Sequence, residues 1–389
     1  MQTRRVTFLL FLCTALILLG TVSAPSALAE DRWYVFDEKH IPDDLGFLVS
    51  DYTGTVHITF LGDCTLGGES RLRGSRYGFV QTVKEKGYGW PFRNLTALTA
   101  GDDLTVANLE GVLSDRDTLE REDKKYNFLG QADYTEILKQ GSVECVTLAN
   151  NHSHDYGEQG YRDTKENIAK AGIASFGTDH MAVWERDGLL IGFTGVNYSA
   201  SGNYGKRLEK QIGILRDLGC AAVITVIHTG DEHTQEINER QRQAAAKAIE
   251  SGADLVVGHH PHVIQGMTVT DGVPVVYSLG NCVFGGTMYP DDSDALVLRA
   301  DLDFKDNALT GITLRFFPIS YSGRKDRNDY SPVFLEGDDA ARALGKMEIS
   351  TGYTMPPFSS GSGSAVTLPA VNGIPSETDD IVNHTHILL

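Results

Sequence analysis

Seven of the twelve histidines lie in three short segments, each directly after a run of apolar residues. They are His152 and His154, then His228 and His233, then His259, His260 and His262. Two further apolar runs end at acidic residues, Asp63 and Glu110. Imidazole and carboxylate groups together are the usual protein ligands of borderline divalent metals, and imidazole also transfers protons near neutral pH. Each residue alone is typical of a turn or a solvated loop, whereas their joint occurrence after five apolar runs indicates a metal or catalytic site.

The apolar runs have the length of buried strands and alternate with helical patterns. Strands are expected at 56–61, 103–107, 143–148, 188–196, 221–227, 254–257 and 274–277, and helices at about 131–140, 157–171, 206–218 and 236–251. This alternation favours a parallel or mixed sheet covered by helices. In such sheets ligands bind beyond the carboxyl ends of the strands, which is where the polar residues occur. Residues 294–317 alternate around Asp306-Asn307 and predict a closing hairpin.

Composition and charge restrict the function classes. The chain has 389 residues, of which 41% are hydrophobic and 22% charged, so it can bury a sizeable core. Asp and Glu number 52 against 34 Lys and Arg, a net charge of −18. This balance argues against nonspecific binding to nucleic acid or to an anionic membrane surface. An anionic substrate stays compatible with it, because a bound metal inverts the local field.

Both ends of the chain differ in composition from its middle. Residues 1–29 carry a basic start, an apolar run and an Ala-Leu-Ala end, which predict a secretory signal. The alternative is an uncleaved anchor, since the run approaches the ~20 residues that span a bilayer. Either predicts export, to the extracellular face of the cytoplasmic membrane or into the medium. We expect an N-terminal extension at 30–54, the main domain at 55–325, a C-terminal extension at 326–354 and a flexible Pro/Gly/Ser-rich tail at 355–389.

Four cysteines follow the predicted signal, Cys64, Cys145, Cys220 and Cys282. Cys64 and Cys282 each follow a strand-end polar residue, so we expect both near one pocket. Three alternatives are open: a bridge between these two cysteines, which an exported chain permits, buried free thiols, or soft metal ligands. Strand alternation directs both side chains away from the polar residues and disfavours ligation.

Some polar residues near the strand ends have simpler interpretations. Asp155 precedes a helical pattern with Glu158 three residues later, which predicts a helix N-cap with a capping-box partner. Alternation predicts that His154 and His260 point away from their neighbours. His57 lies inside a strand and is expected to be structural.

Six segments resemble, in order, the signature of the bacterial capsule synthesis proteins of the CapA type, which are implicated in poly-γ-glutamate synthesis. The segments are Gly62-Asp63, Asn108-Leu109-Glu110, Ala149 to His152 with Asp155-Tyr156-Gly157, His228 to Glu232, Gly258 to Val263, and Tyr277 to Asn281. The resemblance covers about 55–290. That family is similar to calcineurin-like metallophosphoesterases, which implies an α/β fold, a four-layer α/β sandwich, and a site for one or two divalent metal ions.

The resemblance also implies roles for individual residues. The implied metal ligands are Asp63, Glu110, Asn151, His228, His259 and His262. His152 corresponds to the catalytic proton donor, and Asn108, Glu232 and Asn281 to residues that bind substrate or support the ligands. The phosphoesterases have a histidine two residues after the first aspartate, where this chain has Thr65, so one metal position lacks a ligand. The metal is left open among Mn, Zn, Fe and Mg.

Two functions follow from the resemblance. The first is a metal-dependent hydrolase or transferase that acts on a phosphoester or a γ-glutamyl amide at the outer cell surface. The second is a non-catalytic subunit that binds or exports an anionic polymer. Either would work beside a membrane-bound capsule synthase complex, and neither involves nucleic acid. The Asn151-His152 pair favours the enzyme, and Thr65 favours the binding subunit.

Overall fold

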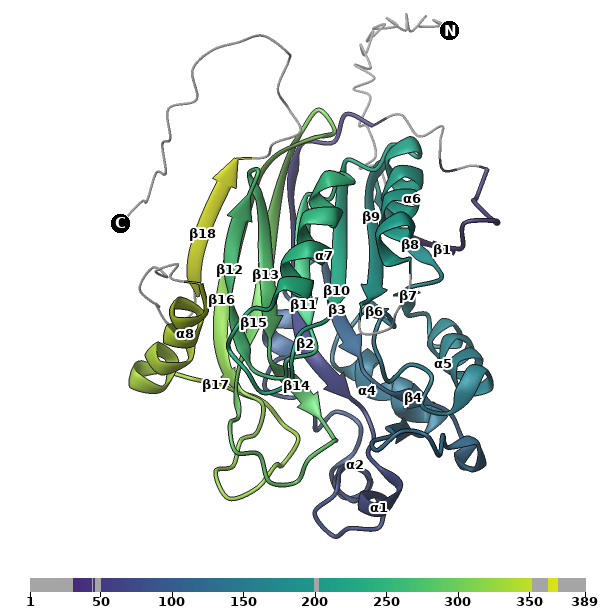
Figure 1. The fold of residues 1–389 in the computed structure, drawn as a ribbon, viewed down its shortest axis with the longest axis vertical. Helices are drawn as coiled ribbons and strands as arrows, with labels where there is room; N and C mark the ends of the chain where they lie inside the picture. Colours follow the sequence, from purple (N-terminus) through teal and green to yellow (C-terminus); the bar gives the residue numbers. More distant parts are fainter. Residues whose placement is uncertain (1–30, 44, 46–49, 199–202, 352–362, 370–389) are drawn as a thin grey trace, which may run out of the picture. The chain divides into compact units, whose positions relative to one another are not determined.

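The computed structural model describes residues 31–43, 45, 50–198, 203–351 and 363–369 (Figure 1). The expected signal at 1–29 and most of the predicted tail lie outside these residues. Within the described ranges, no helix combines the length and the apolar character needed to cross a membrane.

The described strands form two large sheets and a small two-stranded one. The first sheet has the order β1 (Arg32–Phe36), β8 (Met181–Arg186), β9 (Leu189–Asn197), β10 (Ala222–His228), β11 (Leu255–His259), β13 (Val273–Leu279), β12 (Ile264–Thr270). The second has the order β17 (Val333–Phe334), β16 (Ala308–Ser320), β15 (Asp294–Lys305), β2 (Gly54–Thr65), β3 (Leu104–Leu109), β6 (Cys145–Thr147), β7 (Ala174–Phe176). In the second sheet β14 (Asn281–Phe284) also pairs with β2, and β18 (Ser364–Pro369) with β16. The small sheet joins β4 (Val112–Leu113) to β5 (Leu129–Gly130).

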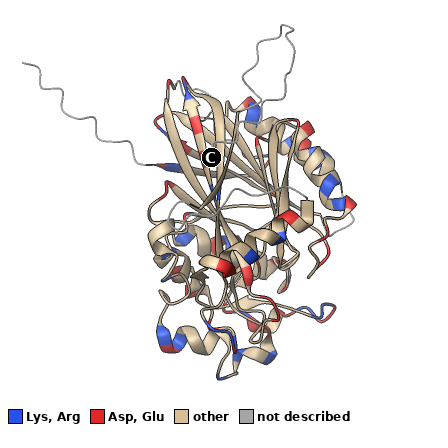
Figure 2. Cartoon of the chain, turned by 90° about the vertical axis from the view of Figure 1, so that its left-hand side faces the viewer, with Lys and Arg blue, Asp and Glu red and all other residues tan. Residues whose placement is uncertain are grey.

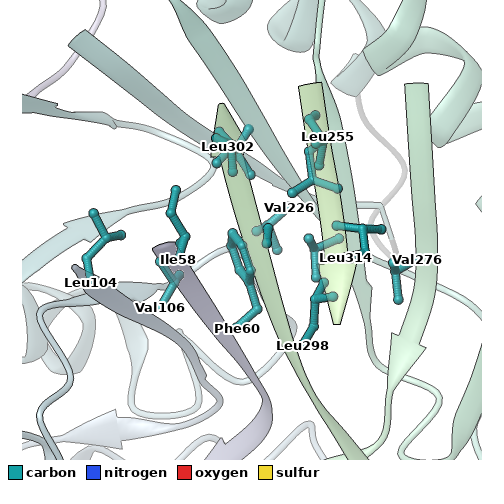
Figure 3. Packing of buried hydrophobic residues seen from close by; sticks show 14 of the residues in the cluster. Ile58, Phe60, Leu104, Val106, Val226, Leu255, Val276, Leu298, Leu302 and Leu314 are labelled. Atoms are coloured by element: carbon teal, nitrogen blue, oxygen red, sulfur yellow. The ribbon is translucent and has the colours of Figure 1, made fainter. Parts of the chain in front are cut away.

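The main apolar core lies between the two large sheets. Ile58 and Phe60 of β2 belong to the same buried cluster as Val226 of β10, Leu255 of β11 and Leu298 of β15 (Figure 3). Strands buried on both faces account for the nearly continuous apolar runs in the sequence. The charged residues lie mostly outside these strands. In Figure 2 the coloured acidic and basic residues are found mainly on helices and loops, while the strands are mostly tan.

Helices cover the outer face of each sheet. On the first sheet lie α6 (Tyr204–Asp217) and α7 (Glu239–Glu250). On the second lie α2 (Phe79–Lys86), α4 (Thr135–Gln140) and α5 (Gly157–Lys170). The order of helices, sheet, sheet and helices makes the four layers of an α/β sandwich, so the expected fold class is confirmed. Shorter helices are α1 (Ser70–Arg73), α3 (Thr96–Thr99) and the 3₁₀ turns Asp117–Leu119 and Ala132–Tyr134, and α8 (Gly337–Thr351) packs on β12 and β16.

The parallel strands place their carboxyl ends where the sequence predicted. Strands β9, β10, β11 and β13 run parallel in the first sheet, and β2, β3, β6 and β7 run parallel in the second. The predicted hairpin is confirmed as β15 and β16, whose turn residues Asp306 and Asn307 have φ of 49° and 62°. Asp and Asn tolerate this left-handed backbone better than other side chains.

Residues 364–369 of the predicted tail form a strand. This segment is strand β18, which pairs antiparallel with residues 311–316 of β16 and buries Val366. Its alternating Ala-Val-Thr-Leu sequence has strand character that the Ser/Gly-rich composition just before it obscured. Strand β1, inside the predicted N-terminal extension, likewise pairs with β8.

The cysteines are buried free thiols. All four described cysteines are free. Cys64 on β2 and Cys282 on β14 lie on adjacent strands, within the apolar cluster that packs against α2, α4 and α5. The bridge and the soft-ligand alternatives are therefore not what the structure shows.

Candidate metal centre

The chain passes from one sheet to the other beside the site. Strand β13 ends at Leu279 in the first sheet, Gly280 adopts φ of 74°, and β14 begins at Asn281 beside β2 of the second sheet. The Gly280 carbonyl accepts a hydrogen bond from the Asp63 backbone N–H at 2.9 Å. A Cβ on Gly62 would lie 2.1 Å from that carbonyl oxygen, so only glycine permits this approach. The crossing fixes Asp63 where the strand ends of both sheets meet.

Asp63 is a buried, ionised carboxylate. Its Oδ1 accepts a hydrogen bond from Asn108 Nδ2 at 2.8 Å and lies 3.1 Å from Nδ1 of His259. Its Oδ2 lies 3.0 Å from Nδ1 of His262. Burial alone would raise the pKa of Asp63, but the two imidazoles outweigh burial and hold this pKa well below its usual range.

Glu110 is buried without a hydrogen-bond partner. It directly follows β3, and neither carboxylate oxygen is hydrogen-bonded or exposed to water. The nearest imidazole nitrogens are Nε2 of His228 at 3.5 Å, Nδ1 of His262 at 3.8 Å and Nε2 of His152 at 4.0 Å. Burial raises the pKa of Glu110 well above its ordinary value. An unpartnered buried carboxylate is costly, and a nearby cation would remove most of that cost.

His228 and Asn151 connect the two sheets. His228 ends β10, is fully buried, and its Nε2 lies 2.7 Å from Oδ1 of Asn151, which follows β6. Its Nδ1 lies 3.4 Å from Asn108 Nδ2. Burial, with a further contribution from His260, lowers the pKa of His228 well below its ordinary value. The ring is therefore neutral, which is the form that binds metals.

The loop after β11 brings His260 into the site, contrary to the alternation argument. Its ring centroid lies 4.8 Å from that of His228, and it shares a group of potential metal ligands with Glu110 and His228. Burial and the nearby His262 lower the pKa of His260 to about 4. His260 and His262 have φ of 103° and 58°, so the strand periodicity does not apply to them.

Among the described residues, three sets of three side chains could hold a metal ion. Within each set, the donor atoms lie within 4.8 Å of one another. The sets are Glu110, His228 and His260; Asp63, Glu110 and His262; and Glu232, His260 and His262. Of the six ligands implied by the resemblance, Asp63, Glu110, His228 and His262 occur in these sets, Asn151 contacts His228, and His259 contacts Asp63. Oδ1 of Asn281 accepts a hydrogen bond from Nδ1 of His262 at 2.9 Å, and Asn108 contacts both Asp63 and His228.

His262 holds a positive charge beside the side chains of Asp63 and Glu110. Burial acts to lower its pKa, but Glu110 and Asp63 outweigh burial and raise the pKa of His262 to about 10. Metal ions displace protons from such ligands. The donor set of carboxylates, imidazoles and an amide oxygen, together with the unpartnered oxygens of Glu110, fits a divalent metal of the Mn or Zn type.

His152 is held by a carboxylate on the side away from Glu110. Its Nδ1 lies 2.7 Å from Oδ2 of Asp155, and its ring lies 4.3 Å, between centroids, from that of Phe128. Of the two ring nitrogens of His152, Nε2 is the one that faces Glu110, at 4.0 Å. Burial lowers the pKa of His152. The arrangement leaves Nε2 to exchange a proton with a group bound at the site.

The predicted N-cap role of Asp155 is wrong. Helix α5 begins at Gly157, its N-cap is Tyr156, and no side-chain hydrogen bond caps it. The Asp155 carboxylate instead contacts His152, the backbone N–H of Phe128 at 2.7 Å, and Nζ of Lys124. The sequence reasoning missed Lys124, because it lies in a charged segment that reads as a solvated loop.

Comparisons with known proteins identify a family that covers most of the residues described above. Residues 57–286, more than half of the chain, match the family described as bacterial capsule synthesis protein PGA_cap. The PGA biosynthesis protein CapA of Bacillus subtilis is 29% identical over 246 residues, covering 58% of this chain and 62% of that protein. The capsule biosynthesis protein CapA of Bacillus anthracis is 27% identical over 252 residues, covering 58% of this chain and 59% of that protein.

The match therefore spans about three fifths of each of these two relatives. It includes the residues of the candidate site, from Asp63 on β2 to Asn281 at the start of β14. The chain belongs to the family of bacterial capsule synthesis proteins PGA_cap.

Proposed function

We propose that this protein is a metal-dependent hydrolase or transferase of capsule polymer synthesis, acting on a phosphoester or a γ-glutamyl amide. The observation that carries the proposal is Glu110, a buried carboxylate with no hydrogen-bond partner, surrounded by nitrogens of His152, His228 and His262. Such an arrangement is unfavourable in a purely structural core and favourable around a cation.

The residues divide into a metal-holding group and a proton-transferring group. Asp63, Glu110, His228, His260 and His262 would hold the metal. A divalent ion there would polarise a phosphoryl or carbonyl oxygen of the substrate and promote ionisation of a water molecule.

The proton-transferring group is His152 with Asp155. With Nδ1–H donated to Asp155, Nε2 of His152 faces the site and can deliver a proton to a leaving group or receive one from a nucleophile. Lys124 Nζ lies 2.8 Å from the Asn151 carbonyl oxygen and also contacts Asp155, so it holds both segments in place.

The alternative function is a polymer-binding or export subunit. Thr65 favours it, because it occupies the place of an expected imidazole and its buried Oγ1 has no hydrogen-bond partner. A site that only binds carboxylates does not need a proton-transferring pair, however, and His152 with Asp155 is such a pair. We therefore give the enzyme precedence.

The substrate class and the location are part of the proposal. The names of the two Bacillus relatives support an anionic capsule polymer as substrate or product. The apolar run and the Ala-Leu-Ala end of residues 1–29 support action outside the cytoplasm, which cell fractionation with an antibody to the chain would test.

The test uses the full-length protein, stripped with chelator and reloaded with Mn²⁺ or Zn²⁺. Turnover of p-nitrophenyl phosphoesters and cleavage of poly-γ-glutamate are measured for the wild type and for His152→Ala. We expect metal-dependent turnover of one substrate class and a loss of about 10² to 10⁴ in rate for the variant, with its circular dichroism unchanged. Polymer binding without any turnover in the wild type would instead support the binding subunit.

A further inference from the structure

Two of the donor sets share Glu110, one with Asp63 and His262 and the other with His228 and His260. The first of these two positions lacks the imidazole expected at Thr65. Thr65 lies two residues after Asp63 on β2, hence on the same face, and its buried Oγ1 has no hydrogen-bond partner. The position formed by Asp63, Glu110 and His262 therefore has three close donor residues. Divalent metals in proteins take four or more ligands, and water or a further side chain must supply the rest.

The loop between β10 and α7 supplies a carboxylate on the solvent side of this position. Glu232 is exposed, yet its carboxylate forms a donor set with His260 and His262, all within 4.8 Å of one another. The loop is fixed beside the two histidines because the backbone N–H of the next residue, His233, donates to the Pro261 carbonyl at 2.8 Å.

His260 has a ring nitrogen without a hydrogen-bond partner on the side chain that faces Glu232 and His262. Nδ1 of His260 is buried without a hydrogen-bond partner, and His260 as a whole is only 8% exposed. The Glu232 carboxylate forms no hydrogen bond or ion pair with any other described residue. A buried histidine with an unpartnered ring nitrogen, in one donor set with that carboxylate, is an arrangement that a cation would satisfy.

We propose that Glu232, with His260 and His262, holds a divalent cation at the solvent side of the buried carboxylates and replaces the imidazole that is absent at Thr65. This inference rests on the metal centre of the proposed function and extends it to a second ion. Because one ligand is exposed, this ion exchanges more readily than an ion held by Glu110 and His228.

The test counts Mn²⁺ ions rather than activity. Full-length protein freed of metal is titrated with Mn²⁺, and bound ions are counted from the loss of the free Mn²⁺ signal in electron paramagnetic resonance. Three proteins are compared: wild type, Glu232→Gln, and Glu236→Gln as the matched control. Glu236 is an exposed carboxylate of the same loop, so both variants remove one negative charge from the same segment.

We expect two Mn²⁺ per wild-type chain, and an affinity at least about 10-fold weaker for one of them in Glu232→Gln. Glu236→Gln should bind as the wild type does, and the melting temperatures of the metal-free proteins should agree, since both residues are exposed. Equal binding by Glu232→Gln and the wild type would overturn this inference and leave the proposed function intact. A wild type that binds no Mn²⁺ would overturn both.

Discussion

Replacing Glu110 by glutamine should stabilise the metal-free protein and abolish its stabilisation by a divalent cation. Glu110 is fully buried and neither carboxylate oxygen is hydrogen-bonded, so burial raises its pKa well above the ordinary 4.5. The folded protein therefore holds a proton on this group more tightly than the unfolded chain does. Every unit by which the folded pKa exceeds the unfolded one costs about 1.36 kcal/mol of stability once the pH lies above both values.

The sign of the pH dependence follows from the direction of the shift. A group whose folded pKa is raised contributes no penalty below its unfolded pKa, and the penalty grows as the pH rises above it. Glutamine does not ionise, so its advantage should be near zero at pH 4.5 and increase toward pH 7. The buried amide still needs hydrogen bonds, and each group left unsatisfied costs about 1 to 3 kcal/mol, so the gain at pH 7 is smaller than the pKa shift alone would give.

Urea unfolding of the full-length protein measures both effects. In chelator at pH 7 the variant should be the more stable protein. With Mn²⁺ at about 100 times its dissociation constant the wild type should gain about 2.7 kcal/mol and the variant little, so the difference in stability should shift toward the wild type by about that amount. The reasoning is refuted if Glu110→Gln is the less stable protein in chelator, or if Mn²⁺ stabilises both proteins equally.

Three further substitutions test separate parts of the structure. Asp155→Asn should lower turnover about 10²-fold or more and leave the number of bound Mn²⁺ unchanged, because the carboxylate orients His152 without reaching the metal ligands; a parallel loss of Mn²⁺ would contradict this. Burial raises the pKa of Glu144 to about 7, so Glu144→Gln should stabilise the protein by about 1 to 2 kcal/mol at pH 8 and not at pH 4, as urea unfolding at the two values would show. Gly62→Ala should weaken Mn²⁺ binding and lower the melting temperature, because its Cβ would meet the Gly280 carbonyl, while the control Gly213→Ala on α6 has nothing within 4 Å and should not destabilise.

The sequence predicted those parts of the fold that depend on local periodicity. The strands that contain Phe60, Val226 and Leu255 are buried on both faces. Their sequences are therefore nearly continuous apolar runs, which can be recognised as strands. The helices of the outer layers were recognised from their one-sided patterns. Strand β18 could not be recognised, because its place in the sheet depends on its pairing with β16, which is far away in the sequence.

The candidate site was predictable at the strand ends and not in the loops. Asp63 and His228 lie at the carboxyl ends of strands and Glu110 directly follows one, so the topology alone brings them together. His260 was misjudged because its φ of 103° reverses the direction that alternation assigns to it. Asp155 was misjudged because a cap and a histidine partner have the same local sequence, and the choice depends on Lys124 and Phe128 from another segment.

The passage of the chain at Gly280 has a mechanical consequence. The donors Asp63 and Glu110 belong to one sheet, and His228 and His262 to the other or to its loops, so a bound cation would cross-link the two sheets at one end of their shared core. Its binding free energy would then oppose any sliding of one sheet over the other. Amide hydrogen exchange at the carboxyl ends of β2 and β10 should accordingly slow together when the metal is added, although neither strand pairs with the other.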